Sequence, residues 1–242
     1  MNSLRHATTQ SNETTFDIGL QGHMNKVYAA MSAGLLITFA TAWAVGSNAD
    51  IFSIMRDPET MKPNIIGIGV MLAPLIMLVF SGAIMRKSAN AVRTFFYIFC
   101  AVMGVSLSWI FVAYTSFSIA QVFLITSIAF ASLSLWGYTT KKDISGWGSF
   151  LMMGLVGIIV ASIINLFIFS DALNFAISIV GVLIFAGLTA YDTQNIKQTY
   201  LSHARTGDVE WLDKAATMGA LSLFMHFINM FIMLLNLFGN RE

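Results

Sequence analysis

Seven long apolar runs constrain this chain more than any other feature. Each is long enough, or nearly so, for a helix that rises about 1.5 Å per residue to cross a hydrocarbon core of ~30 Å. Inside such a core the backbone amides and carbonyls must bond within the segment, so each run must be helical. The sequence therefore predicts an all-α polytopic membrane protein, a bundle of seven transmembrane helices. The runs lie at about 27–45, 64–85, 95–114, 119–138, 147–169, 174–192 and 215–238.

The overall composition excludes a water-soluble fold. The chain is 57% apolar and 10% charged, whereas soluble domains carry about 25% charged residues. Its net charge of +1 gives no reason to expect nucleic acid as a partner. The single cysteine, Cys100, can form neither an internal disulfide nor a cysteine-based metal cluster. We expect a polar tail at 1–26 and one transmembrane domain at 27–242, with the lipid bilayer around it.

The lysines and arginines between the runs predict how the bundle is oriented. Basic residues collect in the cytoplasmic connections of membrane proteins. With seven spans the two termini lie on opposite sides, and the more basic side includes the N-terminal tail, which is therefore predicted to be cytoplasmic. That side holds ten basic residues, namely Arg5, Lys26, Arg86, Lys87, Arg93, Lys141, Lys142, Lys197, Arg205 and Lys214, and the other side holds three, namely Arg56, Lys62 and Arg241.

Three ionisable residues in or at the ends of spans are candidate functional residues, because such groups cost about 2.5–3.5 kcal/mol on insertion scales. Arg86 ends the second run and is either an anchor in the headgroup region or a partner for an acid. Asp192 ends the sixth run, where it is either in water or buried by a helix that continues. His226 is the deepest of the three, about twelve residues from either end of the last run.

A narrow polar stripe accompanies His226 along one face of the last helix. At steps of three and four residues it aligns with Ser222, Asn229, Met233 and Asn236. Such side chains can simply bond neighbouring helices to one another. Imidazole is also the side chain whose unperturbed pKa, about 6.5, falls in the physiological range. The stripe is therefore either structural or part of a site that senses protons or ions.

Depth in the membrane suggests which of these groups can meet. Counting about 1.5 Å per residue from the outer face places Arg86 and Asp192 within side-chain reach of one another. Asp192 and His226 differ in depth by about 9 Å, so their contact would require tilted helices or shifted boundaries. The sequence therefore favours an ion pair between Arg86 and Asp192.

Motifs of soluble and membrane enzymes are absent. The sequence contains no GxSxG, no HExxH and no P-loop pattern. A membrane metal hydrolase needs several ligands at one depth, but His6, His23 and His203 lie outside the predicted spans. We expect a protein that is not an enzyme and has no cofactor.

Several segments together resemble the Bax inhibitor-1 family, also called the transmembrane Bax inhibitor motif family, in its bacterial branch. They are "MRKSANAVR" at 85–93, "GYTTKKDISGWGSFL" at 137–151, "AYDTQNIK" at 190–197 and "ALSLFMHFINMFIMLLNLFG" at 220–239. The resemblance covers nearly the whole chain. It implies a central seventh helix surrounded by the other six, in a multi-pass protein of the bacterial inner membrane.

The resemblance also implies a pH-sensitive calcium leak gated by two facing carboxylates on the sixth and seventh helices, with an arginine from the second helix on the first of them. Asp192 matches the first carboxylate and Arg86 the arginine, whereas His226 stands where the second acid is expected. Calcium prefers several oxygen ligands. Asp192 thus remains a calcium contact, at most transient, and passage of protons or monovalent cations gains weight. The alternative is a non-conducting regulator that binds a membrane protease or other membrane proteins.

Overall fold

A computed structural model describes residues 2–57, 60 and 62–241, with side chains described from Ile18 onward. In this part of the chain the regular elements are all helical, and β-pairing is limited to two isolated bridges. The helices in chain order are α1 (Asn2–Gly46), α2 (Ala49–Ser53), α3 (Ile65–Ile84), α4 (Ala89–Ser106), α5 (Ile110–Ala113), α6 (Ser116–Thr139), α7 (Trp147–Ile168), α8 (Asp171–His203), η1 (Ala204–Thr206) and α9 (Val209–Phe238).

Seven segments are long and apolar enough to cross a membrane, as the sequence predicts. The second to fifth lie close to the expected runs. The first begins at Ile18 instead of residue 27, and the sixth helical segment continues to Thr206 instead of ending at 192. The helices are longer than the apolar runs because helical hydrogen bonds are also satisfied beyond the hydrocarbon. An apolar run therefore gives only the minimum length of its helix. The orientation of the bundle in the membrane stays a prediction.

The continuation of α8 beyond residue 192 is packed against the rest of the protein. Thr193, Gln194 and Ile196 are buried. The Gln194 side chain donates to the carbonyl of Lys142 at 2.8 Å and accepts from the amide of Ile144 at 3.0 Å, which ties the α6–α7 loop to α8. The expected long connection at 193–214 is therefore mostly helix.

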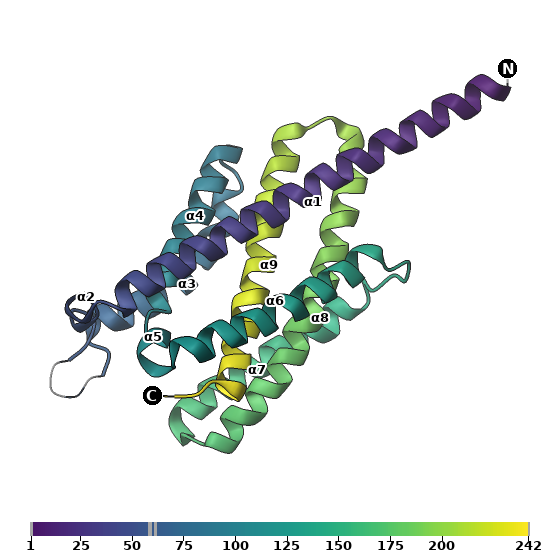
Figure 1. Ribbon diagram of the computed structural model, residues 1–242. Coiled ribbons are helices and arrows are strands. Elements are labelled where there is room, and N and C mark those ends of the chain that lie inside the picture. Colours follow the sequence, from purple (N-terminus) through teal and green to yellow (C-terminus); the bar gives the residue numbers. More distant parts are fainter. Residues whose placement is uncertain (1, 58–59, 61, 242) are drawn as a thin grey trace.

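The last helix, α9, is the centre of the bundle. Two-thirds (67%) of its apolar window is buried, against 11% for α3 and for α7. It packs directly against α1, α4, α6 and α8, whereas α3 packs on α4 and α7 packs on α8. Figure 1 shows α9 running behind α1 and α6 through the middle of the molecule. A central seventh span is thus confirmed, with four of the six other spans in direct contact with it.

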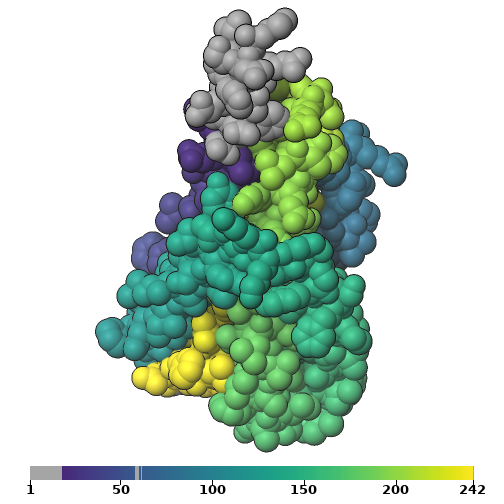
Figure 2. Space-filling view, turned by 90° about the vertical axis from the view of Figure 1, so that its right-hand side faces the viewer, coloured from purple at the N-terminus to yellow at the C-terminus, as the bar shows by residue number. Residues whose placement is uncertain are grey.

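The C-terminal end holds α9 to the loop before α6. The amide of Thr115 donates to the carbonyl of Asn240, and the amide of Asn240 donates to the Ser118 hydroxyl at 2.9 Å. Arg241 and Tyr114 form one of the isolated bridges. Figure 2 shows this yellow end lying between α6 and the green α7–α8 hairpin. The C-terminal end of the central helix is therefore fixed to the loop before α6.

Candidate functional site

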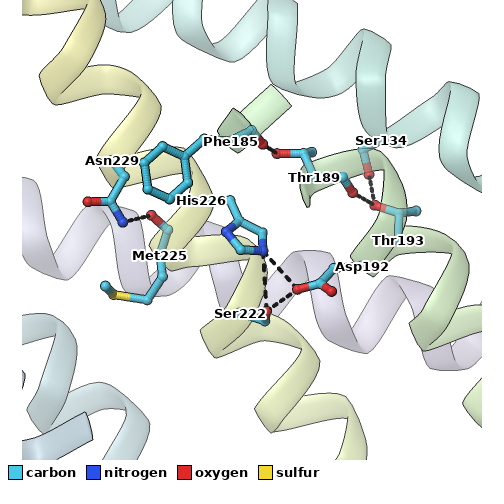
Figure 3. A network of polar contacts seen from close by, with 9 residues as sticks. All are labelled: Ser134, Phe185, Thr189, Asp192, Thr193, Ser222, Met225, His226 and Asn229. Carbon is cyan, nitrogen blue, oxygen red and sulfur yellow. Dashed lines mark hydrogen bonds and ion pairs between the residues drawn. The ribbon is translucent and has the colours of Figure 1, made fainter. Parts of the chain in front are cut away.

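Asp192 of α8 and His226 of α9 meet inside the bundle. The distance between His226 Nε2 and Asp192 Oδ2 is 2.7 Å. The Ser222 hydroxyl, one turn before His226 on α9, donates to the same carboxylate oxygen. The Asp192 and His226 side chains are 17% and 11% exposed, so the pair is largely but not fully enclosed. Figure 3 shows Ser222 and Asp192 directed at the same edge of the imidazole. These three residues are called the α8–α9 polar cluster below.

The opposite edge of the imidazole faces an apolar neighbour. The Phe185 ring lies 6.1 Å from that of His226, on the side away from Asp192 (Figure 3). Among the described residues, His226 Nδ1 has no hydrogen-bond partner although it is buried. An ionised carboxylate only accepts, so when Asp192 is ionised the Nε2 atom carries the proton that points to it. The unpartnered Nδ1 is then the nitrogen that can take a second proton.

The depths estimated from the sequence disfavoured this contact between Asp192 and His226. They placed the two residues about 9 Å apart along the membrane normal, because each depth was measured from the end of its apolar run. In the structure α8 has 33 residues and continues past Asp192, which therefore lies within a helix and not at its end. The lower half of α8 is also clearly inclined to α9 in Figure 1. Residue counting along two inclined helices does not give relative depth.

The predicted pair between Arg86 and Asp192 is wrong. Arg86 is exposed just after the end of α3, and α3 packs against α4 and not in the α8–α9 seam. Within the described residues, the hydrogen-bond and ion-pair partners of Asp192 are Ser222 and His226. The alternative role for Arg86, an anchor at the membrane interface, agrees with its exposure. Their similar depths place Arg86 and Asp192 at one level of the membrane, but depth does not show whether α3 lies beside α8.

The polar stripe on α9 does not act as a unit. Ser222 belongs to the α8–α9 polar cluster. The Asn229 side chain donates to the carbonyl of Met225 in its own helix at 2.8 Å. The Asn236 side chain accepts from the Tyr114 hydroxyl at 3.0 Å, near the C-terminal end of α9. Only one of these three residues therefore supports Asp192 and His226. Whether any of them gates an ion stays a prediction.

A second polar network lies beside the cluster and was not foreseen. The Tyr28 hydroxyl of α1 bonds to Ser134 of α6 at 2.5 Å, and Ser134 bonds to Thr193 of α8 at 2.9 Å. Thr193 in turn donates to the carbonyl of Thr189. The available signal was a pair of threonines four residues apart in an apolar helix. This network joins three helices, and Figure 3 shows no hydrogen bond between its members Ser134, Thr189 and Thr193 and the neighbouring Asp192.

A close helix crossing makes this network possible. A Cβ atom on Gly137 of α6 would lie 2.4 Å from the carbonyl oxygen of Ala190 in α8. Only glycine allows the two backbones to approach this closely. The crossing holds α8 in place immediately before Asp192, and thereby fixes the position of the carboxylate.

The cluster is a poor site for a resident metal ion. Among the described residues, no group of three or more His, Cys, Asp or Glu side chains comes together. Asp192 supplies one carboxylate and Ser222 one hydroxyl, while the third member of the cluster is a nitrogen base. Calcium prefers six to eight oxygen ligands. The cluster therefore provides fewer oxygen ligands than permanent calcium binding requires.

Comparison with known proteins agrees with the resemblance of the motifs. The family model "Inhibitor of apoptosis-promoting Bax1" matches residues 20–242. The chain belongs to the Bax inhibitor-1 family. It is 41% identical to "Inner membrane protein YbhL" of Escherichia coli over 225 residues, which is 93% of this chain and 94% of that protein. It is also 41% identical over 235 residues to an "Uncharacterized protein" of Caulobacter vibrioides, covering 95% and 93% of the two chains.

Membership of the Bax inhibitor-1 family and the seven spans together give the setting of the site. The relative YbhL is named as an inner membrane protein, and the chain has seven helices able to span a bilayer. It is therefore a multi-pass inner membrane protein of the Bax inhibitor-1 family, consistent with a membrane channel or regulator. The α8–α9 polar cluster lies in the bundle of this protein, where any ionisable pair is costly.

Proposed function

We propose that this protein is a pH-sensitive cation leak whose gate is the α8–α9 polar cluster. The observation that supports this most directly is the 2.7 Å contact between Asp192 and His226 on two spans of the bundle. Ionisable residues placed together inside a membrane bundle commonly mark ion or proton pathways. The partial exposure of both side chains leaves the pair within reach of water or a cation.

The charge of the cluster sets whether it attracts or repels a cation. With Asp192 ionised and His226 neutral, the cluster carries one negative charge. With both groups charged, the net charge is zero and the two side chains attract each other. The first state, with its net negative charge, therefore favours a cation at this point of the bundle. Acid changes the cluster by adding positive charge, whereas in a pair of carboxylates acid removes negative charge.

Acid also disturbs the packing around His226. Because Nε2 already donates to Asp192, the added proton goes to Nδ1, which is buried beside Phe185 without an acceptor. A charged N–H without a partner in such surroundings is costly. Either water enters the seam or α8 and α9 move until an acceptor is found. Protonation would thus loosen the seam at the gate, which is a physical basis for response to pH.

A proton or a monovalent cation suits the cluster better than calcium does. The cluster provides one carboxylate and one hydroxyl, and a passing Ca²⁺ would have to keep most of its hydration shell to satisfy its preferred coordination. A transient contact of Ca²⁺ with Asp192 remains compatible with the site. We also propose that the protein is not an enzyme and needs no cofactor, since the sequence contains no GxSxG, HExxH or P-loop pattern.

The test is ion flux through purified protein in proteoliposomes, measured for Ca²⁺, Na⁺ and H⁺ side by side from neutral to mildly acidic pH. We expect His226→Gln to abolish the change in flux with pH while leaving a flux, and Asp192→Asn to reduce cation flux at every pH. Asn229→Ala is the matched control, because Asn229 is also polar and on α9 but bonds its own helix. Arg86→Gln is a second control, because Arg86 is exposed and outside the cluster.

The proposal fails if Asp192→Asn and His226→Gln both leave the flux and its pH profile unchanged. It also fails if Arg86→Gln alone reproduces their effect, since the gate would then involve α3. Wild-type protein that carries none of the three ions would instead favour a non-conducting regulator that acts on a membrane protease or other membrane proteins.

A further inference from the structure

A groove runs between α1 and α6, and its lining on α9 consists of Phe227, Ile228 and Phe231, on a different face from Ser222 and His226 of the polar cluster. Both helices pack against α9, and Figure 1 shows them crossing in front of it and diverging. The groove consists of two hollows of about 540 and 840 Å³. They share Ser32, Leu35, Ser127 and Phe227 and are therefore continuous. This combined space is called the α1–α6 groove.

The groove is about as long as the hydrocarbon core of a bilayer is thick. On α1 its lining extends from Gln21 to Trp43, which corresponds to about 33 Å at 1.5 Å per residue. A hydrocarbon core is about 30 Å thick. Its walls open to the lipid, since Leu36 and Leu124, one on each helix, are 71% and 61% exposed. Lipid therefore has direct access to the groove along its whole length.

The two ends of the groove differ in chemistry. Toward Trp43 the lining is mostly apolar, with Phe39, Phe111 and Phe231 among its members. The opposite end carries most of the polar groups. They are Gln21, Asn25, Tyr28, Ser134 and Tyr138. An occupant that matches this groove has one polar end and a long apolar body.

The polar end is also the positively charged end. The Lys197 ammonium donates to the carbonyl of Tyr138 at 2.8 Å and lies 5.0 Å from the centre of its ring. Lys141 and Lys142 follow directly after α6 and are exposed. On the prediction from the basic residues of the connections, this end faces the cytoplasm.

The acids at the same end are already engaged. Asp213 pairs with Lys26 at 2.7 Å, and Asp143 accepts from the amide of Ser145 at 2.9 Å. Neither acid therefore offsets the three lysines at positions 141, 142 and 197 through an ion pair with them. The excess of positive charge at the mouth of the groove matches an anionic group.

The size of the groove favours a lipid over a protein helix. The bond between Tyr28 and Ser134 crosses from α1 to α6 and would obstruct a helix. Each hollow has a volume typical of a small-molecule site, roughly 300–1,000 Å³. A slender chain fits where a helix does not.

We propose that the α1–α6 groove binds one anionic phospholipid, with its phosphate near Lys197 and Tyr138 and an acyl chain along the apolar lining toward Trp43. Lysine recognises phosphate as a point charge, and basic residues beside a membrane segment attract anionic lipids. The hydroxyl and amide groups at this end supply further hydrogen bonds for a headgroup. The bound chain completes the packing between two helices that do not pack closely on each other.

The test is native mass spectrometry of the protein reconstituted with equal amounts of phosphatidylglycerol and phosphatidylcholine of the same chain length. We expect one retained phospholipid per chain, mainly phosphatidylglycerol. Ser127→Phe fills the groove at the junction of the two hollows and should remove the retained lipid. Ser132→Phe is the matched control, because both serines lie on α6 and bond the carbonyl four residues before, but only Ser127 lines the groove.

A charge variant separates the headgroup from the chain. Lys197→Gln should keep a bound lipid but lower the preference for phosphatidylglycerol about fivefold, the factor that corresponds to ~1 kcal/mol for one lysine at an anionic surface. If Ser127→Phe does not fold, Ala131→Leu tests the same wall from the smaller hollow.

Three results would overturn the proposal. They are no retained lipid in the wild type, equal retention of the two lipids by the wild type, and equal loss of lipid in Ser127→Phe and Ser132→Phe. A protein that copurifies with the wild type, without bound lipid, and is lost only in Ser127→Phe would assign the groove to a transmembrane partner.

Discussion

The two sides of the central helix α9 differ in what fills the space beside it. On one side α8 packs closely and encloses Asp192 with His226. On the other side α1 and α6 leave an open groove whose polar groups lie at one end. The difference teaches that the ionisable pair of this bundle lies where helices pack closely, whereas the side of α9 that lipid can reach is lined mostly by apolar side chains.

Side-chain size explains why one side closes and the other does not. Between helices in lipid the attraction comes from packing, so small residues decide how closely helices approach. In the α8–α9 seam, a Cβ atom on Gly219 would lie 2.9 Å from Ile196, and one on Gly181 would lie 2.9 Å from Met233. In the groove, aromatic rings such as those of Phe123 and Phe231, 6.1 Å apart, occupy the space between the helices.

The largest expected difference is between two phenylalanines. Phe185→Ala should cost about 3–5 kcal/mol of unfolding free energy, because Phe185 is 5% exposed and its loss leaves a cavity in the closed seam. Phe123→Ala should cost much less, because Phe123 is 39% exposed and lines a groove that lipid can refill. Unfolding by sodium dodecyl sulfate in mixed micelles measures both. Equal losses would mean that the two sides of α9 are packed alike.

The contact within the polar cluster should give the next largest effect. A double-mutant cycle of Asp192→Ala with His226→Ala should yield a coupling energy of about 1–2 kcal/mol, near the upper end of values for side-chain bonds in membrane bundles. A cycle of Asp192→Ala with Asn229→Ala is the control and should show almost none, since Asn229 bonds its own helix. Coupling of similar size in both cycles would indicate general loosening of the seam.

The smallest effect should come from the polar bond that crosses the groove. Tyr28→Phe removes the bond to Ser134, and Ser134 keeps its bond to Thr193. The expected loss is about 0.6 kcal/mol, the average for such bonds in a membrane protein. Tyr97→Phe serves for comparison, because no hydrogen bond of the Tyr97 hydroxyl is found within the described residues. A loss from Tyr28→Phe as large as that from Phe185→Ala would mean that α1 and α6 depend on this contact.

Much of the fold followed from the sequence, but less of the site did. The seven spans and the central place of the last one agree with expectation. His226 and Asp192 were identified as unusual because each is ionisable in or beside an apolar run. Their contact was disfavoured, and the contact with Arg86 was preferred, because distance along the membrane normal was the only coordinate that the sequence supplied. The pattern of Tyr28, Ser134 and Thr193 in the sequence is too weak to predict the network that they form.

The amino-acid sequence by itself determined that this chain forms seven membrane-spanning helices, and that an acid and an imidazole lie among them. The reason is that lipid leaves the backbone no alternative to helical hydrogen bonds and makes every charged side chain conspicuous. Only the tertiary structure decided that Asp192 meets His226 and not Arg86, and that α1 and α6 stay apart. Position around the bundle depends on which small and large side chains interlock, and that information is not contained in the depth of each residue.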